Sequence, residues 1–166
     1  MAEYNVGYIY HIRQWKEPFA NMKMKNGKSV SSSGCAVCAF AMLIGHKEGY
    51  GESDAVQVVT DLIEECTDSN AYITNTFSNK TINGKQYSSI EVSDMAAQIQ
   101  KGIPVVVRLA KNGSAVHYVT VVGLDTSKSG MEAYIILDPG KDSNYTLQDA
   151  LNYNAGSAVA GKYIIN

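Results

Sequence analysis

A nearly continuous apolar run follows a serine-rich loop in the first third of the chain. The loop ends at SSSG, residues 31–34, and the run CAVCAFAMLI covers residues 35–44 before Gly45. A helix that is apolar on almost all sides is buried, and a glycine after the last apolar residue is a common helix end. The pattern therefore predicts a short buried helix over residues 35–44, with Cys35 in its first turn.

Three further segments have the spacing of helices. The segment 53–66 begins at Ser53, a good capping residue, and its apolar residues recur at helical intervals. These are Val56, Val59, Leu62 and Ile63. The segment 90–101 is followed by Gly102, a residue typical of a helix end, and the segment 146–153 predicts a last short helix.

Strand-like runs dominate the second half of the chain. They cover residues 104–110, 117–125 and 133–140, and a short apolar run at 159–165 follows the last helix. The connections are too short for crossovers, so adjacent strands should be antiparallel. An Asn83-Gly84 turn also indicates a hairpin or loop between residues 69 and 90. Helices first and an antiparallel sheet second predict the α+β class.

Composition indicates one globular domain over residues 1–166. Hydrophobic residues make up 45% and charged residues 18% of the chain, and no repeat or linker-like segment divides it. The net charge is -2, and lysine and arginine form no run that would neutralise phosphates, which argues against nucleic acid or a membrane surface as partner. Neither a bilayer-spanning stretch nor a secretory signal is evident. We therefore expect synthesis in the cytoplasm with release through a partner pore or a secretion system, or else a segment of a larger secreted protein.

Cys35 is the first candidate for chemistry. A cysteine at the start of a buried helix lies near unpaired backbone N–H groups and the positive end of the helix dipole, which favours a thiolate. The alternatives are a buried core thiol, a redox pair with Cys38, or a metal ligand. A thioredoxin-like pair should follow a parallel strand, and a zinc site needs further ligands at matching spacing. Neither pattern is present, so we predict no metal and no cofactor, and the role of Cys38 stays open.

His117 and Asp138 are the residues most suited to assist Cys35. His117 begins the strand 117–125, where a side chain can reach into a cleft, and Asp138 ends the apolar strand 133–138. Two neighbouring antiparallel strands could bring the two side chains together. Each also has a plainer interpretation, because a lone histidine is often structural and an aspartate before proline often starts a turn.

Four motifs together resemble a known family. These are RQW at residues 13–15, SSSGC at 31–35, a histidine entering VTVVGLD at 117–125, and ILDPG at 136–140. They are similar to bacterial papain-like cysteine peptidases related to the double-glycine leader-processing domains, cysteine-peptidase family 39. The resemblance implies a papain-like fold with N-terminal helices packed on an antiparallel sheet. It departs from the frequent Gly-Cys-Gly-Pro-Thr pattern, because Cys38 occupies the threonine position.

The resemblance also implies a role for each residue. Cys35 would be the nucleophile, His117 the general base and then acid, Asp138 the residue that orients His117, and Gln14 the amide of the oxyanion hole. The predicted activity is hydrolysis of an amide bond through a thioester intermediate, with peptidoglycan peptides as the leading substrate, as in a phage-type lysin. Alternatives are a general or leader-processing protease, a thioester-forming transferase or deamidase, and an inactive papain-like binding module. The oligomeric state and the scissile bond stay unknown.

Three lysines lie in the loop before Cys35. Lys23, Lys25 and Lys28 could attract an acidic substrate, or they could simply belong to a solvated loop. The sequence leaves both interpretations open.

Overall fold

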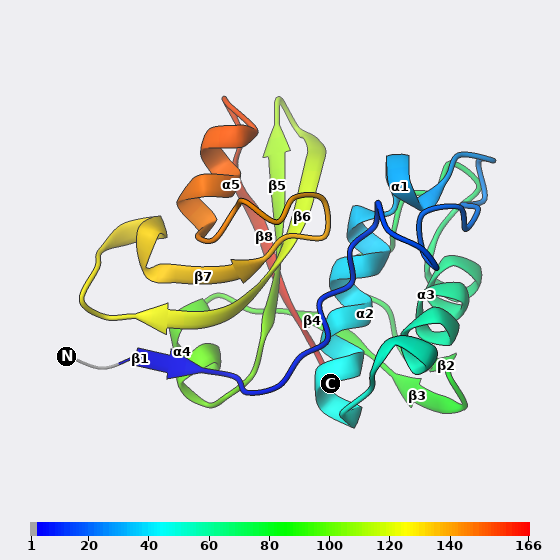
Figure 1. Ribbon diagram of the computed structural model, residues 1–166, viewed down its shortest axis with the longest axis horizontal. Coiled ribbons are helices and arrows are strands. Elements are labelled where there is room, and N and C mark those ends of the chain that lie inside the picture. The colour runs from blue at the N-terminus through cyan, green and yellow to red at the C-terminus, as the bar shows by residue number, and fades with distance from the viewer. Residues whose placement is uncertain (1–2) are drawn as a thin grey trace.

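Figure 1 shows a computed structural model of the protein, which describes residues 3–166. The helices are α1 Val30–Ser33, α2 Cys35–Glu48, α3 Glu52–Cys66, α4 Met95–Gln100 and α5 Leu147–Tyr153, with a 3-10 turn η1 Gly130–Ala133. The strands are β1 Glu3–Asn5, β2 Lys80–Ile82, β3 Lys85–Tyr87, β4 Ser89–Glu91, β5 Val105–Lys111, β6 Ser114–Asp125, β7 Tyr134–Leu137 and β8 Ala158–Ile165. The α+β class predicted from the sequence is confirmed.

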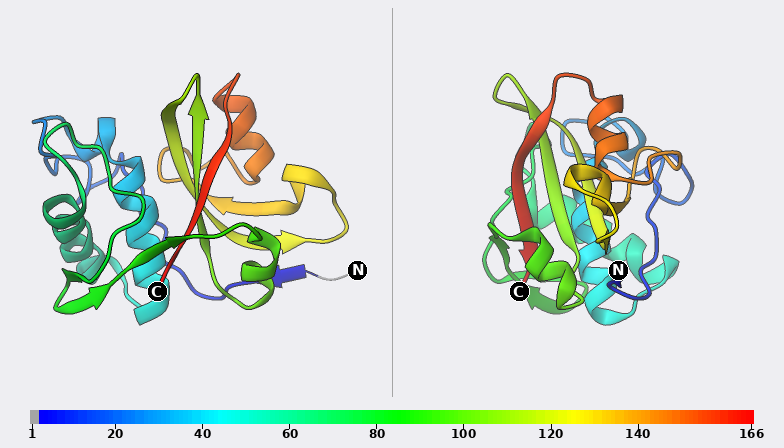
Figure 2. Two further views of the ribbon diagram at one scale, coloured as in Figure 1. Left: turned by 180° about the vertical axis from the view of Figure 1, so that it is seen from behind. Right: turned by 90° about the vertical axis from the view of Figure 1, so that its left-hand side faces the viewer.

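One antiparallel sheet forms the centre of the structure. Its strand order is β1-β6-β5-β8-β4, and β7 pairs with β6. The helix α2 packs on one face with α3 outside it, whereas α4 and α5 pack on the other face (Figure 1; Figure 2 shows the same layers from behind and from the side). The small β2-β3 hairpin lies against α3.

Apolar side chains fill both faces of the sheet, because successive residues of a strand point to opposite sides. On β5, Val106 belongs to the core around α2 and α3, while Val105, Val107 and Leu109 belong to the core beneath α4 and α5. Arg108 follows the same alternation and lies on the α2 side. The predicted domain over residues 1–166 stays a prediction.

Several element boundaries differ from the sequence prediction. The helix α2 continues through Gly45 to Glu48 and ends at Gly49, whose φ of 74° is the left-handed conformation that glycine adopts easily. Gly51, not Ser53, precedes α3. The predicted helix 90–101 is shorter in the structure. Its first two residues belong to β4, which pairs with β8, and α4 starts only after Asp94, whose side chain accepts a hydrogen bond from the Ala97 N–H. The elements α1 and β1 were not predicted.

The hairpin between β5 and β6 places His117 differently from the prediction. Asn112 and Gly113 both have positive φ and form a two-residue turn, so Lys111 pairs directly with Ser114. The strand β6 therefore begins at Ser114, and His117 lies within it. The predicted hairpin at Asn83-Gly84 is confirmed, and so is the last helix, which begins at a capping box formed by Thr146 and Asp149.

Within residues 3–166, no helix combines the length and the apolar character that a bilayer crossing requires.

Candidate active site

Cys35 is the first residue of α2 and is partly exposed. The helix starts directly after α1, with Gly34 between them. A Cβ on Gly34 would lie 2.6 Å from Cγ1 and 2.7 Å from the carbonyl oxygen of Val30, so only glycine fits this close approach. The thiol therefore lies at the positive end of a 14-residue helix whose first N–H groups have no partner within the helix.

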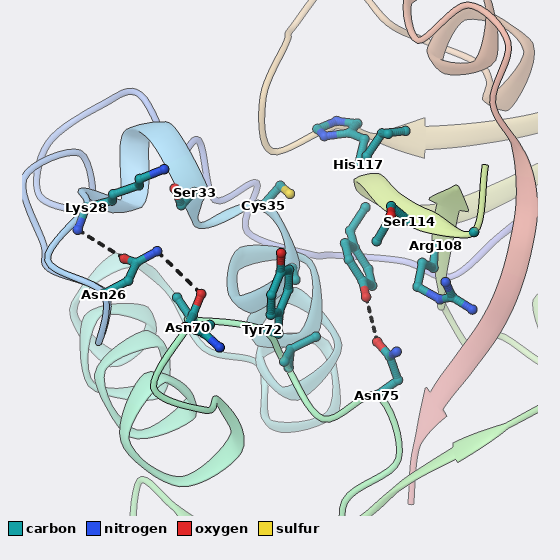
Figure 3. A pocket seen from close by; sticks show the side chains of 17 residues that line it. Asn26, Lys28, Ser33, Cys35, Asn70, Tyr72, Asn75, Arg108, Ser114 and His117 are labelled. Carbon is teal, nitrogen blue, oxygen red and sulfur yellow. Dashed lines mark hydrogen bonds between the residues drawn. The ribbon is translucent and has the colours of Figure 1, made fainter. Parts of the chain in front are cut away.

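His117 faces Cys35 from the sheet. Its Nε2 lies 2.6 Å from Oδ1 of Asp138, and Cys35 is close enough to raise the pKa of the imidazole. Figure 3 shows the sulfur of Cys35 and the ring of His117 at the same rim of a cleft. The strands β6 and β7 are neighbours, with Thr120 opposite Leu137, and this register brings His117 beside Asp138 as anticipated.

Asp138 is 1% exposed, and its carboxylate is surrounded by donors. Besides the bond to His117, Oδ1 accepts the Gly140 N–H at 2.8 Å, and Oδ2 accepts Nδ2 of Asn144 at 2.9 Å. The carbonyl oxygen of Asp138 lies 2.7 Å from Nε2 of His11. A buried carboxylate with these partners has one orientation available.

The surroundings of His117 and Asp138 favour the charged form of both side chains. Burial alone would lower the pKa of His117, but hydrogen bonds to Asp138 and Cys35 outweigh it and raise the pKa to about 10. Burial alone would raise the pKa of Asp138, but hydrogen bonds from His117, Asn144 and the Gly140 N–H hold it below its usual value. Near neutral pH the arrangement therefore contains an aspartate and an imidazolium beside Cys35.

Gln14 lies next to these residues, between α1 and the loop after β7. Its backbone N–H donates to the Pro139 carbonyl at 2.9 Å, and its Nε2 donates to the carbonyls of Ser31 at 3.0 Å and Val30 at 3.3 Å. Its Oε1 is buried and has no partner. The amide hydrogens thus point to α1 carbonyls, and a role for Gln14 in an oxyanion hole stays a prediction.

Two residues that the sequence analysis did not single out belong to the site. Asn144 is 7% exposed and holds Asp138 directly, and His11 holds the backbone of the same residue. Asn144 lies in a polar loop, and its only sequence signal is its place six residues after Asp138. Asparagine in such a loop is usually a turn residue, so its contact with Asp138 could not be read from the chain.

The remaining cysteines lie apart from the cleft. All three thiols are free, and burial raises the pKa of Cys38 and, to about 11, that of Cys66. The predicted core or boundary position of Cys66 is confirmed, since it is 2% exposed. A helix rather than a strand precedes Cys35, which is unlike a thioredoxin-type redox motif. Residues 3–166 contain no group of three or more His, Cys, Asp or Glu side chains able to hold a metal ion.

A cleft of about 500 Å³ opens beside Cys35 and His117 (Figure 3). The N-terminal loop, α1 and the segment between α3 and β2 form one wall, and β5, β6 and their turn form the other. Most side chains that line it are polar or small: Asn26, Lys28, Ser33, Ala36, Asn70, Ala71, Tyr72, Asn75, Arg108, Gly113, Ser114, Ala115 and Tyr118. The cleft can therefore hold a short extended peptide with its carbonyl carbon near the thiol.

Comparison with known proteins agrees with this geometry. Residues 8–161 match the Peptidase_C39 like family, which is nearly the whole chain. The protein belongs to this family and is in general terms a cysteine peptidase, and the structure is a papain-like peptidase fold. The search of curated proteins and the search of solved structures found no match.

Proposed function

We propose that the protein cleaves an amide bond with Cys35 as nucleophile, His117 as general base and acid, and Asp138 as the residue that orients His117. The observation that carries the proposal is that Cys35 and His117 line the same cleft, with Nε2 of His117 2.6 Å from Oδ1 of the buried Asp138. Nucleophile, base and orienting group in hydrogen-bond contact are the arrangement that thiol hydrolases need.

The first half of the reaction forms a thioester. The Cys35 thiolate attacks the substrate carbonyl carbon, and the backbone N–H of Cys35 can donate to the oxyanion that develops. The His117 imidazolium then gives its proton to the leaving amine as the C–N bond breaks.

The second half restores the enzyme. Neutral His117 takes a proton from a water molecule, which attacks the thioester and releases a carboxylic acid and the Cys35 thiolate. Gln14 would act as a second oxyanion donor, which requires that one of its amide hydrogens leaves the Val30 or Ser31 carbonyl.

The substrate that we propose is the peptide portion of peptidoglycan, with a peptidase or amidase activity like that of a lysin. The polar lining of the cleft supports a short polar peptide over an apolar one. The oligomeric state does not enter this proposal.

Digestion of two substrates side by side tests the proposal. Purified bacterial sacculi and an unstructured protein are incubated with wild type, Cys35→Ala and a control variant, His46→Ala. Since His46 binds the Val6 carbonyl away from the cleft, the control should behave as wild type. We expect muropeptide fragments and new amino groups from wild type, identified by mass spectrometry, and none from Cys35→Ala.

The other outcomes separate the alternatives. Cleavage of the protein alone would replace the peptidoglycan substrate by a general or leader-processing protease. Ammonia release from a glutamine peptide without chain cleavage would indicate a deamidase or transferase. A biological effect that survives Cys35→Ala would indicate a binding module.

A further inference from the structure

The charged side chains that line the cleft beside Cys35 are all basic. Among residues 3–166, Lys28 and Arg108 are the charged side chains that line it apart from His117, and no aspartate or glutamate does so. The chain as a whole has 16 acidic and 14 basic residues, so a wall with cations alone departs from the overall balance. In Figure 3, Lys28 lies on the α1 side of the cleft and Arg108 on the sheet side.

Arg108 is held in place but keeps free donors. Its Nε donates to the hydroxyl of Tyr163 at 3.4 Å, and its Nη2 donates to the Ala160 carbonyl at 3.2 Å. A guanidinium has five N–H donors, so these two bonds leave three of them unused. Glu91 acts on Arg108 by charge from β4, but it forms no ion pair with it and does not line the cleft. An anchored guanidinium with free donors suits a carboxylate.

Lys28 differs from the two other lysines of the same loop. The ammonium group of Lys25 donates to the carbonyls of Glu64 and Thr67 at the end of α3, and Lys23 does not line the cleft. Within residues 3–166, the ammonium group of Lys28 has no hydrogen-bond or ion-pair partner. The backbone N–H of Lys28 donates to Oδ1 of Asn26 at 3.0 Å, which holds the loop at this residue.

We infer that the cleft recognises peptides with side-chain carboxylates, through Arg108 on one wall and Lys28 on the other. The inference rests on the proposed function, because it assigns the substrate class of the same site. Asn70, Asn75 and Tyr72 add hydrogen-bonding groups between the two cations. The peptides of the substrate are therefore acidic rather than neutral or basic.

The test measures occupancy of the cleft without requiring turnover. Iodoacetamide alkylates Cys35 in the presence of a tripeptide of three glutamates or of three glutamines, both with blocked ends. We expect the glutamate peptide to slow alkylation about ten-fold at a concentration where the glutamine peptide has no effect, because charge-assisted hydrogen bonds distinguish the two. Raising the salt concentration should weaken the protection.

Variants locate the effect. Lys28→Met and Arg108→Met should each reduce the protection, and the double variant should remove it, whereas the charge-matched control Lys101→Met should leave it unchanged. Lys101 lies at the end of α4 and does not line the cleft. Thermal unfolding of each variant confirms that it is folded. Equal protection by both peptides, no protection by either, or full protection in the folded double variant would overturn the inference.

The outcomes for this inference and for the proposed function are distinct. Protection by the glutamate peptide without digestion of sacculi or protein would support the inference and contradict the proposed function. Digestion of sacculi or protein without selective protection by the glutamate peptide would support the proposed function and contradict the inference.

Discussion

At the scale of single residues, the site depends on the residues that hold Asp138 and, through it, the imidazole of His117. Asp138 is buried without a lysine or arginine partner, and its negative charge is balanced by His117, Asn144 and the Gly140 N–H. A Cβ on Gly140 would lie 3.1 Å from Cε1 of His117, so a larger residue there would push against the imidazole. The position of the imidazole is therefore determined by the loop that follows β7.

The protonation of His117 gives the first prediction. With a pKa raised to about 10, the imidazolium is present below that pH and is lost as the pH rises through it. In wild type, the NMR signal of the His117 ring should show no titration step between about pH 6 and 8. In Cys35→Ala the titration should move to lower pH, because the hydrogen bond and the charge of Cys35 both raise the pKa.

The positive charge of His117 beside Cys35 also predicts the reactivity of this thiol. Iodoacetamide should label Cys35 rapidly at about pH 6, and His117→Ala should slow the labelling at least about ten-fold, because the thiolate loses its cation. His46→Ala is the matched control. Equal labelling of Cys35, Cys38 and Cys66 at this pH would contradict an activated thiol.

Asn144 gives a prediction for a positioning residue. Asn144→Leu removes the donor to Oδ2 of Asp138 and leaves a buried acceptor without a partner, a cost of about 1–3 kcal/mol. The pKa of Asp138 should rise, that of His117 should fall, and Cys35 labelling at pH 6 should slow. The ring titration of His117 distinguishes this from a loss of stability alone. The control variant Asn152→Leu, at an exposed position of α5, should leave the pKa of His117 and the rate of Cys35 labelling unchanged.

At the scale of elements, the junction of α1 and α2 positions the thiol. Gly34 has φ -99° and ψ 12°, a conformation open to any residue, so its requirement is steric and comes from Val30. The same residue lets Cys35 start a new helix directly after α1. A shift of this junction would move the thiol relative to His117, which is carried by the separate strand β6.

Gly34→Ala tests this junction. The added methyl group collides with the Val30 backbone and side chain, and we expect a loss of about 1–3 kcal/mol in the free energy of unfolding, measured with urea. Cys35 labelling should slow as well. The control is Gly51→Ala, directly before α3. A Cβ at this position has no atom within 4 Å, so the free energy of unfolding should change little. Equal effects of the two substitutions would contradict the steric explanation.

At the scale of the whole molecule, the site lies between two parts that must keep their spacing. Cys35 belongs to the helical layer, while His117 and Asp138 belong to the sheet and its loop. Phe40 joins the layers: its ring centroid lies 6.0 Å from that of Phe77, 6.5 Å from that of Tyr118 and 5.9 Å from that of Tyr163. This aromatic cluster keeps α2 against β6 and β8.

Phe40→Ala should therefore destabilise the whole fold. The side chain is fully buried, and its loss should lower the free energy of unfolding by about 3–5 kcal/mol in urea denaturation. Tyr145→Ala removes a ring that is 70% exposed and should stay within about 0.5 kcal/mol of wild type. A small effect of Phe40→Ala would show that the layers are held together elsewhere.

The α+β class and the family could be predicted from the chain, and Cys35, His117 and Asp138 could be named as candidates, because apolar periodicity, turn residues and short motifs are local properties. Residues 90 and 91 were assigned to a helix because the pairing of this segment with β8 joins positions more than 70 residues apart and leaves no local signal. Asn144, His11 and Arg108 became visible only in the folded structure for the same reason, whereas Lys28 was already a candidate in the sequence. Local spacing determines helices and strands, whereas the partners of a buried carboxylate and the charge of a cleft depend on which distant segments pack together.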